Sequence, residues 1–351
     1  MIASPQGIGE GFRPGSPTIV AALSLALFAI YGGSIAIRSF AQRQRITVFE
    51  IVQAALAFLI GTMGALTATH NSIATAIGIV FLLLSGACYW GALWRFAEEA
   101  YTRNRRVSAS WAAALLLAGS ALLLPATLQA AFLSVAAVTV ALLYTRTGKF
   151  SLGLHASLFL AAAAAVSPLP GYVVSALAGS VPSAPSWPVW VVAVAAALCY
   201  GIGARRPEAK RRRRTLWVVP AILLGFTAAA AAVAAIVWII GARTGMSASA
   251  LSVVRTVVNC VLALTLGFLA SRQKRVELGW VAYTAVGFGA LKLLFEDLRF
   301  GNAASLVISL LFYGLVLILL PRLTRRTEPE AEIASVVAGP AERPTSAAAG
   351  R

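Results

Sequence analysis

Apolar residues form long, nearly uninterrupted runs along this chain, and short polar segments separate them. An α-helix of about 20 apolar residues is long enough to cross the hydrocarbon core of a bilayer. The pattern therefore predicts an all-α fold, a polytopic membrane bundle of eleven helices over residues 18–320. The predicted spans lie near 18–37, 46–66, 72–94, 108–125, 128–145, 150–167, 187–204, 215–240, 248–270, 277–297 and 303–320.

The fourth and fifth spans share one apolar stretch, from Val107 to Tyr144. That stretch is too long for a single crossing of the membrane. Pro125 and Gln129 stand near its middle, and a proline there favours a turn. We therefore expect two helices on either side of Pro125.

The connections between the predicted spans alternate between basic and nearly uncharged. The chain has 29 Lys and Arg against 12 Asp and Glu, a net charge of +17, and most of its basic residues lie in every second connection. Short cytoplasmic loops accumulate Lys and Arg. The alternation predicts an external N-terminus and a cytoplasmic C-terminus.

The two ends of the chain differ in composition from the spans. Residues 1–17 carry only Glu10 and Arg13 as charges, without the basic stretch of a cleaved signal peptide, so we expect a disordered external segment and a retained first helix. Residues 327–351 are rich in Glu, Ala, Pro and Ser. That composition is typical of a disordered tail, here on the cytoplasmic side.

One connection is strongly basic but too short for a domain. Because it lies between two spans, we expect it to contact anionic lipid at the cytoplasmic face and not nucleic acid. Its basic residues are Arg205, Arg206, Lys210, Arg211, Arg212, Arg213 and Arg214.

The residues that most catalytic and metal sites require are rare. The chain has one Asp, Asp297, and two His, His70 and His155, while its three cysteines stand singly on apolar segments. Zinc sites need three or four such ligands close together. No nucleotide-binding or zinc-protease motif is present either. We expect no metal, no cofactor and no disulfide, although an unmarked serine nucleophile stays open.

The external connection at 167–188 holds five of the fifteen prolines of the chain. Prolines resist regular structure and stiffen a loop. The apolar stretch 171–178 inside this connection is far too short to span. Two interpretations stay open, a re-entrant segment that caps a cavity and an ordered surface loop.

Charged residues inside predicted spans are rare, and two of them lie at one depth. Arg255 lies about 10 Å from the external start of the ninth span, and Lys292 lies a similar distance from the external end of the tenth. A cation inside a bilayer costs ~2.5 kcal/mol or more, so acidic partners should be near. The candidate site therefore comprises Arg255, Asn259, Lys292, Glu296 and Asp297, joined by His70 and Asn71 from the second external end.

Two interpretations of this candidate site compete. In one, Arg255 and Lys292 extend to the interface and pair with Glu296 and Asp297, which fixes the helix hairpin. In the other, the two cations face a water-filled vestibule and bind an anionic group such as a carboxylate, a phosphate or a lipid headgroup.

The last hairpin carries a recognisable arrangement of residues: Lys292-Leu-Leu-Phe-Glu-Asp297-Leu, then Ser305, Ser309 and Gly314-Leu-Val-Leu-Ile-Leu-Leu-Pro321-Arg322. It resembles the end of a group of bacterial predicted polytopic membrane proteins of unknown function. In that group a Lys and an Asp-Leu pair close one helix, and an Arg stands where this chain has Asn302. The resemblance implies a multi-pass protein of the bacterial inner membrane and implies no activity.

Together these observations favour a non-enzymatic integral membrane protein, either transporter-like or a membrane scaffold, with its site at the external ends of the ninth and tenth spans. The alternative is an envelope enzyme that acts on a lipid or lipid-linked substrate at the external face. Only Glu296, Asp297 and His70 could supply an acid or base there. A sensor that works through the tail at 327–351 is a third hypothesis.

Overall fold

The computed structural model describes residues 16–41, 44–95, 102–179, 184–204, 215–244, 247–298 and 302–325. Helices make up nearly all of these residues, and the described ranges contain no strand. The predicted all-α fold is confirmed. The predicted disorder of 1–17 and 327–351 and the basic connection at 205–214 fall almost entirely outside the described residues.

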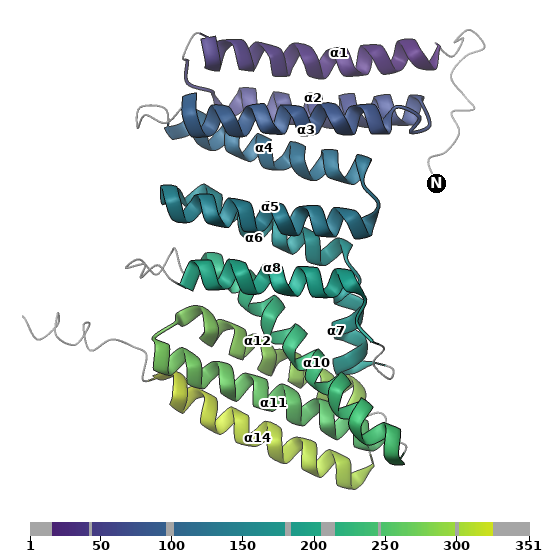
Figure 1. Ribbon diagram of the computed structural model, residues 1–351, viewed down its shortest axis with the longest axis vertical. Helices are drawn as coiled ribbons and strands as arrows, with labels where there is room; N and C mark the ends of the chain where they lie inside the picture. Colours follow the sequence, from purple (N-terminus) through teal and green to yellow (C-terminus); the bar gives the residue numbers. More distant parts are fainter. Residues whose placement is uncertain are drawn as a thin grey trace, which may run out of the picture. The chain divides into compact units, whose positions relative to one another are not determined.

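The chain divides into two compact units, Met1–Val166 and Ser167–Arg351. In the first unit, helices that follow each other in the chain pack as pairs, α1 with α2, α3 with α4 and α5 with α6 (Figure 1). Its elements are α1 (Pro17–Ala36), η1 (Ile37–Ala41), α2 (Val48–Ala68), α3 (Ala74–Trp90), η2 (Gly91–Arg95), α4 (Thr102–Leu123), α5 (Ala126–Thr147) and α6 (Phe150–Val166). The predicted turn at Pro125 separates α4 from α5.

In the second unit, α11 packs against both α12 and α14, and α10 runs obliquely beside them (Figure 1). The elements are α7 (Leu169–Ala178), α8 (Trp187–Ala204), η4 (Thr215–Trp217), α10 (Val218–Thr244), α11 (Ala248–Gln273), α12 (Val276–Lys292), η5 (Leu293–Asp297) and α14 (Ala303–Arg325). Each unit has a packed interior of its own, and whether residues 18–320 form one bundle stays a prediction.

A helix overlaps each of the eleven predicted spans. Among the described residues, nine helices are long and apolar enough to cross a membrane, and ten if the broken pair α6 and α7 counts as one span. The helix α8 is apolar but shorter. The protein is a multi-pass integral membrane protein, while the number of eleven crossings and their orientation stay predictions.

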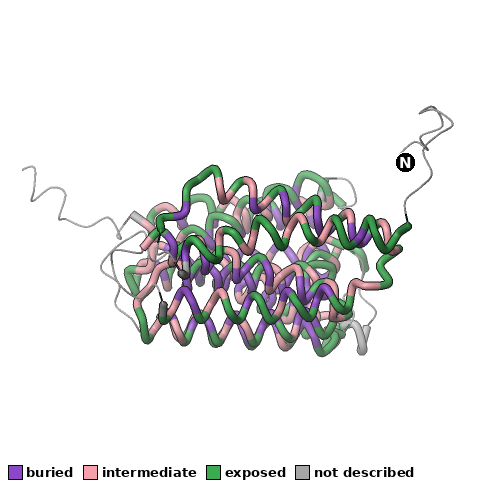
Figure 2. The backbone as a smooth tube through the Cα atoms, turned by 90° about the horizontal axis from the view of Figure 1, so that it is seen from above, coloured by how far each residue is buried: buried purple, intermediate pink, exposed green. Residues whose placement is uncertain are grey.

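Alanine is the most frequent residue type in the interiors of the two units, beside large residues such as Phe81 and Phe159, and many other large apolar residues face outward. Ala65, Ala112 and Ala137 are fully buried, whereas Leu83 and Trp238 are 70% and 76% exposed. Exposed positions recur along the helices (Figure 2). In a soluble protein such a surface would aggregate, but lipid solvates it, and small interior residues let helices approach closely.

Two glycine contacts show how close the helices of the first unit approach. A Cβ added to Gly61 would lie 2.6 Å from the backbone oxygen of Ser24 on α1. A Cβ added to Gly119 would lie 2.9 Å from the backbone oxygen of Gly78 on α3. Neither distance is possible for a real Cβ atom, so the contacts α1–α2 and α3–α4 require glycine at these positions.

Contacts in the first unit join connections that the charge pattern assigns to one side. Asn104 at the start of α4 donates its amide to the backbone oxygen of Gln44 and accepts from the backbone N–H of Ile46. Burial and the nearby Arg105 lower the pKa of Lys149, so the connections after the third and fifth predicted spans also lie close together. The sidedness itself stays a prediction.

The proline-rich connection contains a helix that the sequence did not predict. Residues Leu169–Ala178 form α7, with Pro170 in its first turn. Proline fits the first turn because the N–H that it lacks would have no partner there. The segment inside the connection is thus helical, and both interpretations, a re-entrant segment and an ordered surface connection, stay open.

Candidate functional site

The candidate site lies in the second unit, where α7, α11 and the end of α12 meet. Arg255 stands in the second turn of α11, Lys292 is the last residue of α12, and Glu296 belongs to the π-helical turn η5 that follows. A π-turn adds a residue to the helical repeat and is frequent at functional sites. Here it sets the direction of Glu296 relative to Lys292.

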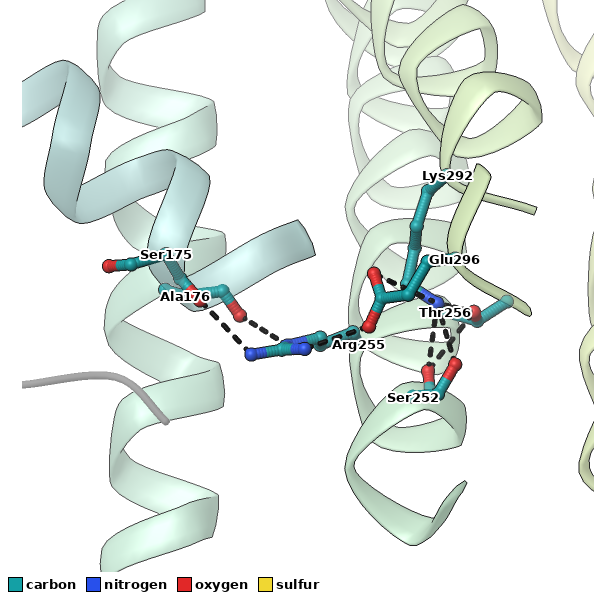
Figure 3. Close-up of polar contacts among 7 residues, drawn as sticks. All are labelled: Ser175, Ala176, Ser252, Arg255, Thr256, Lys292 and Glu296. Carbon is teal, nitrogen blue, oxygen red and sulfur yellow. Dashed lines mark hydrogen bonds and ion pairs between the residues drawn. The ribbon is translucent and has the colours of Figure 1, made fainter. Parts of the chain in front are cut away.

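Arg255 is 2% exposed and lies between two partners (Figure 3). Its Nη1 donates to Oε1 of Glu296 at 2.8 Å. Its Nε and Nη2 donate to the backbone oxygens of Ala176 and Ser175, at 2.8 and 3.0 Å. The guanidinium therefore joins η5 to α7 and does not extend to the surface of the unit.

The two backbone oxygens that Arg255 binds belong to the last turn of α7. The last four carbonyls of a helix have no N–H partner within it, and they form the negative end of the helix dipole. Arg255 supplies both hydrogen bonds and a positive charge there. A ten-residue helix too short to span is thus anchored to α11 by one side chain.

Lys292 is 4% exposed, and its ammonium turns toward α11 (Figure 3). Its Nζ lies 3.1 Å from the backbone oxygen and from the hydroxyl of Ser252, and 2.9 Å from the hydroxyl of Thr256. An ammonium has three donors, and three oxygens on one helix face accept them. Lys292 therefore fixes the end of α12 against α11.

Glu296 is the only described carboxylate that forms an ion pair with these two cations. Its Oε1 binds Arg255, and its Oε2 lies 4.0 Å from Nζ of Lys292. This Oε2 is buried and has no hydrogen-bond partner among the described residues. Two buried cations thus pair with the same carboxylate.

Residues of α11 that contact the cluster follow a helical repeat. Ser252, Arg255, Thr256 and Asn259 are buried and share one face of α11. Sequence reasoning found Arg255 and Asn259 but missed Ser252 and Thr256, although all four have the spacing of one helix face. That spacing was the available signal.

Asn259 lies on this face but binds a different group. Its Nδ2 donates to the backbone oxygen of Ala285 on α12 at 2.9 Å, and its Oδ1 is buried without a partner among the described residues. A Cβ added to Gly289 would lie 2.7 Å from the same Nδ2. Asn259 therefore joins α11 to α12 beside the ion pairs.

The other predicted site residues are placed as follows. Asp297 ends η5, and its side chain lies outside the described part of the chain. His70 and Asn71 belong to the first unit and form the left-handed turn between α2 and α3, with φ of 48° and 65°. That Asp297 and His70 join the cluster stays a prediction.

Within the described ranges, no three His, Cys, Asp or Glu side chains lie close enough to hold a metal ion. The second histidine of the chain, His155, pairs through Nδ1 with the hydroxyl of Tyr89 at 3.1 Å, inside the first unit. The described polar cluster of the second unit thus consists of cations, hydroxyls, an amide and one carboxylate.

Comparisons with family models, with curated proteins and with solved structures found no match to this chain. The resemblance of the C-terminal hairpin to bacterial membrane proteins of unknown function therefore depends on the residues of that hairpin alone.

Proposed function

We propose that this integral membrane protein is transporter-like, without enzymatic activity, and binds a small oxyanion, a carboxylate or a phosphate, between Arg255 and Lys292. The observation that supports this proposal is the buried cluster itself, in which Arg255 and Lys292 lie on either side of Glu296 and both form ion pairs with it. Two cations that already hold a carboxylate in a buried site have the charge and the donors that a carboxylate or a phosphate requires.

Glu296 acts in this proposal as an internal anion that occupies the site when it is closed. All three nitrogens of the Arg255 guanidinium donate hydrogen bonds, Nε and Nη2 to the end of α7 and Nη1 to Glu296. A ligand that takes over these donors would displace the α7 carbonyls or Glu296. Binding would favour a state in which α7 is released from α11, as a gate requires.

The experiment measures thermal unfolding of the full chain in nanodiscs with inorganic phosphate or acetate, against chloride at equal ionic strength. Saturating ligand should raise the Tm by about 2–4 °C. Arg255→Gln and Lys292→Gln should lose this shift. Arg272→Gln should keep it, since Arg272 is an exposed cation on the same helix.

Glu296→Gln separates an anion site from a structural ion pair of a membrane scaffold. Removing the internal anion should raise the affinity for phosphate or acetate at least about tenfold, because the ligand no longer competes with a buried charge. If the protein is a membrane scaffold, Glu296→Gln should lower its stability, and neither anion should raise the Tm of the native chain. No shift in the native chain with either anion would overturn the proposal.

The alternative of an envelope enzyme has no geometric support of this kind. It would use Glu296, Asp297 or His70 as an acid or base, and Glu296 already accepts a hydrogen bond from Arg255. The bacterial inner membrane as the location, and anionic lipid at residues 205–214 as a partner, stay proposals that rest on the hairpin resemblance and on the charge pattern.

A further inference from the structure

The first unit contains a large apolar cavity that the oxyanion proposal does not use. Its volume is about 690 Å³, within the ~300–1,000 Å³ of most ligand sites. Residues of α1, α2, α3 and α4 line it, among them Phe28, Gly33, Ala54, Ala76 and Trp111. The cavity therefore lies inside one unit and has walls from four helices.

The two hydroxyls in the lining do not offer polar groups to a ligand. Ser39 donates its hydroxyl to the backbone oxygen of Ala36, and Ser108 donates to the backbone oxygen of Cys88. A cavity lined in this way does not hold water stably. Hydrocarbon is the chemistry that fits it.

The cavity is long enough to hold an acyl chain that spans one leaflet of a bilayer. On the N-terminal helix its lining extends from Leu25 to Ser39, about 20 Å at 1.5 Å per residue. One leaflet contributes about 15 Å of the hydrocarbon core. An acyl chain that enters near Ser39 would thus be accommodated along α1 toward the middle of the membrane.

Charged side chains surround a shallow depression at one end of the cavity, so a phosphate there would lie at the surface against the exposed guanidinium groups. This depression shares three lining residues with the cavity, Ile35, Ser39 and Ile46, and Arg38, Arg45 and Glu50 also line it. Arg38 forms an ion pair with Glu50, so their charges cancel. Arg45 is exposed and has no ion pair among the described residues, which leaves a positive charge at this end.

We infer that this cavity is a binding site for an anionic phospholipid, with an acyl chain along α1 and the headgroup phosphate at Arg45 and Arg38. A hydrocarbon-lined chamber that ends at a basic depression has the polarity of such a lipid. The charge pattern assigns Arg38 and Arg45 to the cytoplasmic side, where anionic lipid is abundant.

The experiment uses native mass spectrometry of the full chain in mild detergent with equal amounts of palmitoyl-oleoyl phosphatidylglycerol and phosphatidylcholine. The native chain should retain one phosphatidylglycerol that survives detergent washing. Phosphatidylcholine should occupy this site about fivefold less, the ratio expected from one basic residue near the phosphate.

Gly33→Leu should fill the cavity and lower retention of this lipid about tenfold. No atom lies within 4 Å of a Cβ added at Gly33, so the variant should fold. Gly86→Leu is the matched control, because Gly86 also faces open space but does not line the cavity. Ala76→Leu is a second filling variant. Arg45→Gln should remove the preference for phosphatidylglycerol.

Three results would overturn the inference. The first is that native chain and Gly33→Leu retain the same number of lipids, with Ala76→Leu also unchanged. The second is equal retention of the two lipids by the native chain. The third is a lipid-free dimer in which a second copy of the chain covers the cavity.

Discussion

Each unit of this protein contains an Arg–Glu ion pair, and the two pairs are placed in opposite ways. In the first unit, Arg38 is 48% exposed and its partner Glu50 is 14% exposed, at the junction of α1 and α2. In the second unit, Arg255 is 2% exposed and also holds the end of α7. The same residue types thus form a surface pair in one place and an interior anchor in the other.

The two pairs differ in the hydrogen bonds that each glutamate keeps when its arginine is removed. Glu50 also accepts from the backbone and the hydroxyl of Thr47 in a capping box, so it keeps partners without Arg38. Glu296 would keep only the longer ion pair with Lys292, at 4.0 Å, and the two carbonyls of α7 would lose the hydrogen bonds from Arg255. Burial therefore decides how much each arginine contributes to stability.

The largest expected effect is that of Arg255→Met. It should lower the free energy of unfolding by about 3–5 kcal/mol, because it leaves the Glu296 carboxylate and two helix-end carbonyls without their donor. Denaturant titration of the chain in micelles would measure it. Arg255→Met with Glu296→Leu should recover part of this loss. A cost no larger than that of Arg38→Met would abolish the contrast.

Lys292→Met should cost about 2–3 kcal/mol, since the ammonium donates to three oxygens of Ser252 and Thr256, and hydrogen bonds to charged groups are strong. The loss is smaller because those oxygens carry no charge. Arg322→Met, an exposed cation on α14, is the control for removing a positive charge. Equal losses for the two variants would show that burial is not the cause.

In the first unit, close packing should matter more than charge. Gly119→Leu should destabilise the chain by about 1–3 kcal/mol, because the new side chain forces α3 and α4 apart. Gly86→Leu, on a lipid-facing position of α3, should be neutral or slightly stabilising. If Gly119→Leu and Gly86→Leu changed the free energy of unfolding equally, the close contact between Gly119 and Gly78 would not determine stability here.

The smallest effect is expected for Arg38→Met, at most about 1 kcal/mol, because an exposed ion pair contributes little. Its contribution should also decline as salt is raised, unlike that of Arg255. Parallel denaturant titrations at low and high ionic strength would compare the two. If salt lowered the stability contributions of Arg38 and Arg255 equally, the difference in burial would not explain how the two pairs behave.

Most of the fold could be predicted from sequence, since apolar runs determine where membrane helices lie. Every predicted span overlaps a helix, and Pro125 separates two of them. The helix α7 could not be found in this way, because ten residues do not make a span and prolines lie before it and in its first turn. Tertiary contacts stabilise α7, among them its packing against α10 and the hydrogen bonds from Arg255.

The candidate site was predictable in part for the same reason. The cost of a cation in a bilayer identified Arg255 and Lys292, and proximity along the helix identified Glu296. Backbone acceptors such as the oxygens of Ser175 and Ala176 have no signature in the sequence, because every residue carries a carbonyl. The cavity at α1–α4 was equally invisible, since an unfilled space depends on how helices pack.

The alanine-rich interiors have a mechanical consequence. Alanine has no rotamers and projects little from a helix, so surfaces of Ala65, Ala112 or Ala137 lack the interlocking ridges that fix the register of two helices. At such positions an alanine face by itself resists sliding of one helix along another only weakly. Buried polar contacts, of Asn104 in one unit and of Arg255, Asn259 and Lys292 in the other, therefore add to the register that the large buried residues set. Loss of one of these contacts should make a shift of one helix along its neighbour easier.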